Sequence, residues 1–126
     1  MATVLVVDDE RPIVNLLRDV LEDEGYTVIE AYDGATALAL ARSRHPDLVL
    51  SDIMLPHMNG AELARTLLAD PPVPHLTVIL MSAAPPPDLA GVPVAAFLGK
   101  PFAITAVSDV VAAHLVVPAD ADDANT

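Results

Sequence analysis

The sequence contains no cysteine and no tryptophan, and Lys100 is its only lysine. Without cysteine the chain can form neither a disulfide nor a metal site built from thiolates. Its apolar runs are far shorter than the roughly 20 residues of a membrane-spanning helix, and Met1 leads directly into an apolar segment with no signal-peptide pattern. We therefore expect a cytoplasmic protein that makes no use of a membrane.

Positive charge is also scarce, because six basic residues stand against 18 acidic residues and give a formal net charge of −12. A chain with this charge is repelled by phosphate backbones, so we expect no direct contact with nucleic acid. Five of the six basic residues are arginine, which indicates a composition that replaces lysine by arginine. The retention of one lysine, at position 100, then needs an explanation.

Apolar residues alternate between two spacings along the 126 residues, of which 53% are hydrophobic. Continuous apolar segments, typical of strands covered on both faces, lie at residues 3–7, 48–51 and 77–81, with weaker ones at 26–30 and 95–98. Helical spacing is found in residues 12–24, 34–44, 60–69 and 104–115. In the first helix the expected buried stripe consists of Ile13, Leu16, Leu17, Val20 and Leu21. Strands that alternate with helices predict one α/β domain with a parallel sheet.

Three local signals indicate where helices begin. Pro12 suits a first turn, Asp33 is placed to cap the second helix, and Asn59 with Glu62 forms a capping-box pattern before the third. The rhythm breaks at residues 85–93, where four of nine residues are proline. Because proline cannot continue inside a helix, we expect the helix between the fourth and fifth strands to be stunted or missing.

The end of the sequence differs in composition from the rest. Residues 118–126 are polar and acidic, and they predict a disordered tail. The folded domain is then expected to span residues 1–117.

Polar side chains are concentrated where the predicted strands end. Asp8 and Asp9 follow the first strand, Asp52 the third, Ser82 the fourth and Lys100 the fifth. Ligands of an open parallel sheet bind at the carboxyl ends of its strands, so these groups are expected to converge. Simpler interpretations exist for each of them. The two adjacent acids could cap the first helix, the serine could merely end its strand, and the lysine could be a surface charge.

Four segments carry a resemblance to a known family. VLVVDDE at 4–10, DLVLSDIMLPHMNGAEL at 47–63, VILMSA at 78–83 and FLGKPF at 97–102 resemble the receiver domain of two-component response regulators. The spacing Asp-x-x-x-Pro-x-Met-Asn-Gly at 52–60 is the most specific of them. The resemblance covers nearly the whole chain and implies a flavodoxin-like, doubly wound sheet of five parallel strands in the order 2-1-3-4-5.

The resemblance also implies a metal site and a phosphoacceptor. Asp52 is expected to accept a phosphoryl group. Asp8, Asp9, Asp52 and the backbone carbonyl of Met54 are expected to hold Mg²⁺, or Mn²⁺ in its place. Magnesium favours oxygen ligands and retains several waters, which this set of ligands allows.

Further roles follow from the same resemblance. Lys100 and the hydroxyl of Ser82 are expected to bind the phosphoryl oxygens, and a flexible point charge at this place explains why a lysine is retained. Ser82 and the aromatic side chain of Phe97 are expected to act together as the switch that changes the surface. The peptide bond between Lys100 and Pro101 is expected to be cis.

These roles predict a stand-alone receiver domain that takes phosphate from a histidine kinase or phosphotransfer protein and acts on an unknown downstream protein. No turnover of an external substrate is expected. A receiver-like binding module that is never phosphorylated, and a receiver fragment of a larger regulator with an output domain, remain as alternatives. A phosphatase with an aspartyl intermediate fits less well, because such enzymes usually carry a second acid where this chain has Met54. The short segment between Ser82 and Lys100 puts any partner surface on a fourth helix in doubt.

Overall fold

One parallel sheet forms the centre of the chain in a computed structural model that describes residues 2–69, 76–83 and 94–120. Its strands are β1 (Thr3–Val7), β2 (Thr27–Ala31), β3 (Leu48–Asp52), β4 (Thr77–Ser82) and β5 (Ala96–Gly99), in the order β2-β1-β3-β4-β5. The described residues form the helices α1 (Arg11–Asp23), α2 (Gly34–Arg44), α3 (Gly60–Ala69) and α4 (Ile104–Asp120). The expected fold class and strand order are confirmed, and each strand lies within one residue of its expected bounds.

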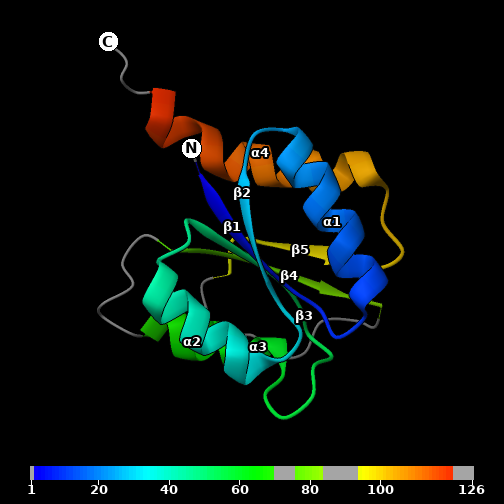
Figure 1. The fold of residues 1–126 in the computed structure, drawn as a ribbon, viewed down its shortest axis with the longest axis vertical. Coiled ribbons are helices and arrows are strands. Elements are labelled where there is room, and N and C mark those ends of the chain that lie inside the picture. Colours follow the sequence, from blue (N-terminus) through cyan, green and yellow to red (C-terminus); the bar gives the residue numbers. More distant parts are fainter. Residues whose placement is uncertain (1, 70–75, 84–93, 121–126) are drawn as a thin grey trace.

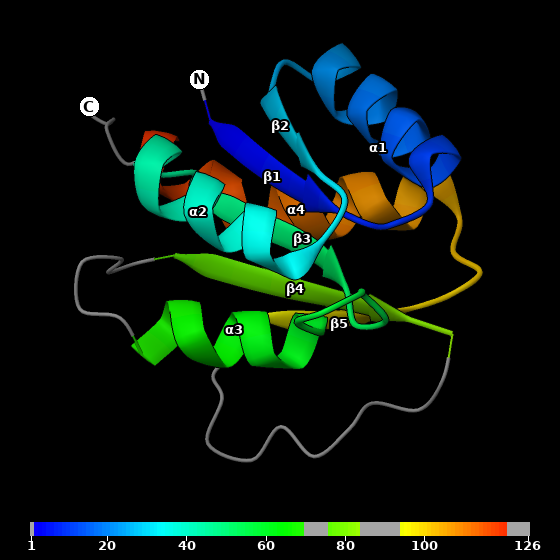
Figure 2. The ribbon, with the colours of Figure 1, turned by 60° about the horizontal axis from the view of Figure 1, so that its bottom comes forward.

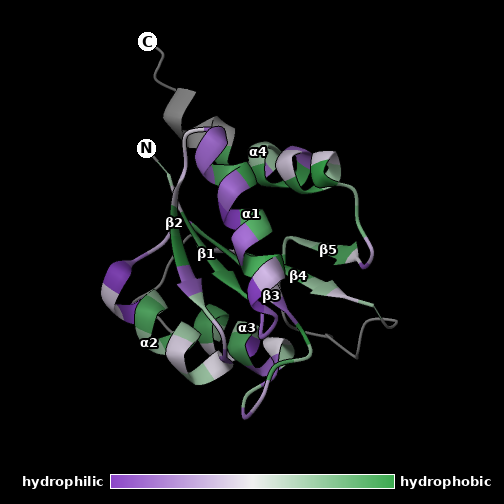
Figure 3. Ribbon diagram, turned by 45° about the vertical axis from the view of Figure 1, so that its right-hand side comes forward, coloured by the Kyte–Doolittle hydropathy of each residue, from purple (hydrophilic) through white to green (hydrophobic). Residues whose placement is uncertain are grey.

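Different pairs of helices cover the two faces of the sheet (Figures 1 and 2). α1 and α4 pack on one face, and α2 and α3 on the other. Alternate residues of β1 therefore enter different cores: Val4 and Val6 pack with α1 and α4, whereas Leu5 and Val7 pack with α2 and α3. A strand covered on both faces must be apolar along its length, as Figure 3 shows for the central strands.

The buried face of α1 differs from the expected stripe. Its buried residues are Val14, Leu17 and Leu21, whereas Leu16 is 43% exposed and Ile13 only partly buried. Residues 14, 17 and 21 repeat at helical spacing and form a complete stripe by themselves. Ile13 packs against the edge of this core, whereas Leu16 adds an apolar surface that the core does not require.

The predicted helix starts agree with the structure in detail. Asp33 accepts a hydrogen bond from the amide of Thr36 at 2.7 Å. At the start of α3, Asn59 accepts from the amide of Glu62 at 2.8 Å, and Glu62 accepts from the amide of Asn59 at 3.2 Å. The capping box therefore satisfies two backbone donors that the helix itself leaves unpaired.

The last helix corrects the predicted boundary of the tail. α4 continues to Asp120, so residues 118–120, which were assigned to a disordered tail, are helical. The remainder of the predicted tail, residues 121–126, lies outside the described residues, as does the proline-rich segment 84–93 with its predicted stunted helix. None of the helices that the structure describes is long and apolar enough to cross a bilayer.

Replacement of Asp33 by alanine tests the cap. We expect the free energy of unfolding to fall by about 1 kcal/mol at neutral pH, with a smaller loss for Asp33→Asn. The hydrogen bond from the Thr36 amide lowers the pKa of Asp33, so this stabilisation is present above the ordinary carboxyl pKa and is lost as the pH falls through the lowered value. Urea denaturation at neutral and acidic pH would contradict the assignment if Asp33→Ala matched the parent protein at both.

Candidate functional site

Parallel strands bring their carboxyl ends to one edge of the sheet, and four of the polar residues predicted from the sequence meet there: Asp8, Asp9, Asp52 and Lys100. The backbone hydrogen bonds of the sheet continue one residue beyond the ends of β1 and β5. The amide of Asp8 donates to the carbonyl of Ala31 at 3.2 Å, and the amide of Lys100 donates to the carbonyl of Ser82 at 2.8 Å. The side chains that follow β1 and β5 are therefore held by regular backbone structure rather than by a free loop.

Three carboxylates form a compact group at this edge. Oxygen atoms of Asp8, Asp9 and Asp52 lie within 4.8 Å of one another. Asp8 is fully buried, Asp52 is 5% exposed, and Asp9 is exposed. One oxygen of Asp8 accepts a hydrogen bond from the amide of Glu10 at 2.9 Å, although α1 itself has no side-chain cap. The other oxygen of Asp8 faces the site.

Lys100 is the cation that neutralises part of this group. Its Nζ donates to Oδ2 of Asp8 at 2.8 Å and to Oδ2 of Asp52 at 3.0 Å. Burial alone would lower the pKa of Lys100, but the hydrogen bonds and charges of Asp8 and Asp52 outweigh it and raise that pKa above its ordinary value. One ammonium cannot balance three carboxylates, so an excess of negative charge remains at the site.

The segment that follows β3 also contacts the phosphoacceptor candidate. The amide of Met54 donates to Oδ1 of Asp52 at 3.2 Å, and the side chain of Met54 is exposed. Ser82 is 3% exposed and pairs with Gly99 in the sheet. Phe97 is partly buried and packs against the core on the α2 and α3 side. The Lys100–Pro101 peptide bond is cis, as expected.

An open cleft of about 370 Å³ gives access to the acids. The residues that line it are Asp9, Glu10, Asp52, Met54, Ala83 and Lys100. This volume can hold a hydrated ion together with a phosphoryl group. The donors fit Mg²⁺, which prefers carboxylate and carbonyl oxygens and keeps part of its water shell. An ion at this place would also offset the uncompensated negative charge.

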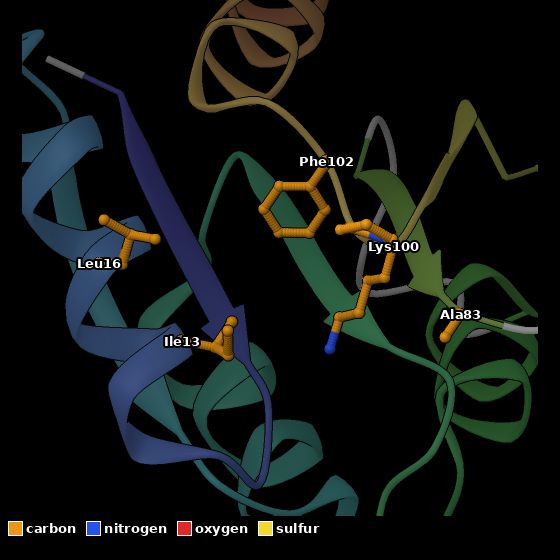
Figure 4. A pocket seen from close by; sticks show the side chains of 6 residues that line it. Ile13, Leu16, Ala83, Lys100 and Phe102 are labelled. Carbon is orange, nitrogen blue, oxygen red and sulfur yellow. The ribbon is translucent and has the colours of Figure 1, made fainter.

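An apolar groove of about 300 Å³ lies beside the cleft, and sequence analysis did not identify it (Figure 4). Ile13 and Leu16 on α1 face Phe102 across the groove, while the Lys100 ammonium turns away from Phe102 toward the acids. Ala83 and Lys100 line both hollows. The signal present in the sequence was the width of the α1 apolar stripe, which exceeds what the core requires.

Comparison with known proteins agrees with this geometry. A model of the response regulator receiver domain family matches residues 4–112. The chain belongs to this family. Among curated response regulators, the polar-differentiation regulator DivK of Brucella ovis is 41% identical over 81 residues, which are 64% of this chain and 66% of DivK. PleD of Caulobacter vibrioides is 45% identical over 82 residues, 65% of this chain but only 18% of PleD.

A solved structure extends the likeness to nearly the whole receiver domain. The chemotaxis response regulator CheY4 of Vibrio cholerae superposes with a TM-score of 0.84 at 28% identity, covering 91% of this chain and 99% of that chain. The sequence alignment spans just under two thirds of the length of DivK. The chain is therefore a receiver domain of the two-component type, and its group of three carboxylates could bind magnesium.

Removal of the Lys100 ammonium tests the role of this ion pair. We expect Lys100→Gln to lower the free energy of unfolding by about 3 kcal/mol without divalent ions, because the buried Asp8 carboxylate loses its partner. Arg65→Gln makes the same change of net charge at an exposed position of α3 and should cost less than about 0.5 kcal/mol. Equal losses of the two variants in urea denaturation would show that the pair does not stabilise the fold.

Proposed function

We propose that this receiver domain is a phosphorylation switch of the cytoplasm in which Asp52 accepts a phosphoryl group from a phosphohistidine. The observation that carries the proposal is the nearly buried Asp52 carboxylate at the carboxyl edge of the sheet, bonded to Lys100 and grouped with Asp8 and Asp9. The donor is a histidine kinase or a phosphotransfer protein. The chain turns over no external substrate and only assists the gain and loss of its own phosphoryl group.

The reaction assigned to Asp52 is a displacement at phosphorus. A carboxylate oxygen of Asp52 forms a new bond to phosphorus while the bond from phosphorus to the histidine nitrogen breaks, and the electron pair leaves with the imidazole. Lys100 moves with the charge, from the Asp52 oxygen to an oxygen of the transferred group. The Ser82 hydroxyl donates to another oxygen of that group. Positioning and neutralisation of charge supply most of what phosphoryl transfer requires.

The metal site completes this assignment. Asp8, Asp9, Asp52 and the carbonyl of Met54 would hold Mg²⁺, with Mn²⁺ as a substitute. When bound, the ion supplies positive charge that offsets the charge of the phosphoryl oxygens. The chain itself contributes the fixed positions of the buried Asp8 and Asp52 carboxylates. It also contributes a cleft that is open to solvent beside the exposed Asp9.

The switch uses the strands on which Ser82 and Phe97 lie. Ser82 ends β4 and pairs with Gly99, two residues beyond Phe97 on β5. Movement of Ser82 toward a phosphoryl group on Asp52 would change the packing of the neighbouring strand and shift the population of Phe97 conformations. Because Phe97 is only partly buried, that shift would reach the molecular surface and a downstream protein.

The apolar groove is the proposed contact for the protein donor. It adjoins the cleft through Ala83 and Lys100, so a donor that covers Leu16 and Phe102 would present its histidine toward Asp52. Leu16 is 43% exposed, although it is a large apolar residue on a helix whose core face is complete without it. Burial of such a residue in a complex stabilises the complex without a cost to the fold.

Phosphorylation by a small donor tests the central assignment. Incubation with acetyl phosphate and Mg²⁺ should add one acid-stable, base-labile phosphoryl group, because the site itself supplies the neutralising charges. Asp52→Asn should abolish the label, and chelation of divalent ions should prevent it in the parent protein. Mass spectrometry of the intact protein measures each result. Full labelling of Asp52→Asn would rule out Asp52 as the acceptor.

A second test separates docking from chemistry. Leu16→Asp should slow transfer from a histidine kinase by about tenfold or more, as expected when a central apolar contact is lost, while labelling by acetyl phosphate stays unchanged. Asn15→Asp places the same charge on the neighbouring exposed position of α1 and serves as the control. If both variants accept phosphate from the kinase at the parent rate, the groove does not receive the donor.

A further inference from the structure

The residues between β3 and α3, 53–59, form a closed loop that we call the acceptor loop. The carbonyl of Ile53 accepts two hydrogen bonds, from the amide of Leu55 at 3.0 Å and from that of Gly60 at 2.9 Å. The amide of Met58 donates to the carbonyl of Pro56 at 2.8 Å. A loop with these internal hydrogen bonds moves as a unit, so the displacement of one residue is transmitted to the others.

The base of the acceptor loop rests on the phosphoacceptor. A Cβ placed on Gly60 would lie 2.3 Å from the carbonyl oxygen of Asp52 and 2.8 Å from the Cα of Ile53. The amide of Met54, within the loop, donates to the Asp52 carboxylate at 3.2 Å. The position of the loop therefore determines how the Met54 backbone and the Asp52 side chain face the cleft.

The far end of the acceptor loop rests on the first residue of α2. A Cβ placed on Gly34 would lie 2.2 Å from the carbonyl oxygen of Met58 and 2.8 Å from its Cβ. Gly34 is buried, and its φ lies outside the left-handed range, so its backbone conformation does not require glycine. What requires glycine is the closeness of the Met58 backbone, which can move only together with the loop to which it belongs.

We propose that Gly34 is a positioning residue for the magnesium and phosphoacceptor site. Its missing side chain lets the Met58 backbone seat against the start of α2, which sets the depth of the acceptor loop over the acids. An added carbon at residue 34 would lift Met58, and the internal hydrogen bonds of the loop would carry the displacement to Met54. The proposal rests on the function proposed above, because it concerns the geometry of the same site.

A pair of glycine substitutions tests this role. Gly34→Ala introduces the collision with Met58. Gly25→Ala is the matched control, because Gly25 has φ +97° with open space around its Cβ, so alanine there strains the backbone and touches nothing. Gly25 precedes β2, at the amino edge of the sheet and opposite to the site. Both variants are expected to melt below the parent protein, but only Gly34→Ala should alter the site.

The first readout requires no metal. In amide NMR spectra of the ion-free proteins, Gly34→Ala should shift the resonances of Met54 and Asp52, whereas Gly25→Ala should leave them in place. The second readout is the Mg²⁺ dissociation constant from NMR titration. Gly34→Ala should raise it roughly tenfold, as expected when a group that orients metal ligands is displaced, and Gly25→Ala should leave it unchanged.

The outcomes distinguish this inference from the proposed function. A folded Gly34→Ala protein with unshifted Met54 and Asp52 amides and parental Mg²⁺ affinity would overturn the positioning role, while a parent protein that binds Mg²⁺ keeps the proposed function intact. A parent protein that binds no Mg²⁺ would count against the proposed function, and the ion-free spectra would still decide the inference.

A second pair of variants applies if Gly34→Ala does not fold. Met58→Gly removes the Cβ that borders Gly34 and frees the loop backbone, so it should shift the Met54 amide and weaken Mg²⁺ binding several-fold. Met58→Ala keeps that Cβ and should leave the affinity within about twofold of the parent protein. Equal Mg²⁺ affinities for the two variants would contradict the role of the contact between Gly34 and the Cβ of Met58.

Discussion

The ammonium group of Lys100 joins two carboxylates that the fold cannot leave unpaired. Asp8 is fully buried and Asp52 nearly so, and each accepts a hydrogen bond from the same nitrogen. A buried carboxylate without a partner is costly, so the ends of β1 and β3 depend on a residue that follows β5. The interaction thus links the first part of the chain to its last strand at the edge where the chemistry is placed.

The same interaction leaves negative charge uncompensated at the site, which is the charge that the proposed function uses. One positive charge faces three negative ones, so the edge favours the binding of a cation and the transfer of charged groups. Neither acid of the ion pair can withdraw, because Asp8 is held by the amide of Glu10 and Asp52 lies within β3. Besides the Glu10 amide and β3, the acceptor loop also supports the two acids. The loop contacts Gly60 at its base and Gly34 at its far end.

Much of the fold followed from local sequence because the local signals agree with one another. The caps at Asp33 and Asn59 start helices where the apolar period also begins, and every expected strand is present. The expected stripe of α1 was confirmed at Leu17 and Leu21 but wrong at Leu16, because Leu16 and Leu17 are adjacent and periodicity alone cannot decide which of them faces the core. The end of α4 was misplaced because the polar and acidic composition of residues 118–126 was interpreted as disorder, whereas the helix continues to Asp120.

The residues at the strand ends could be identified from the order of amino acids alone, because a buried strand must be apolar and its polar neighbours therefore mark its limit. The same order also determined the family, through the spacing from Asp52 to Gly60 and the single Lys100. Three contacts became visible only in the folded chain: one ammonium bridges Asp8 and Asp52, Ile13 and Leu16 line a groove with Phe102, and Gly34 lies against the backbone of Met58. These are contacts between segments far apart in the chain, and their distances depend on how strands and helices pack, a quantity that no local pattern of residues contains.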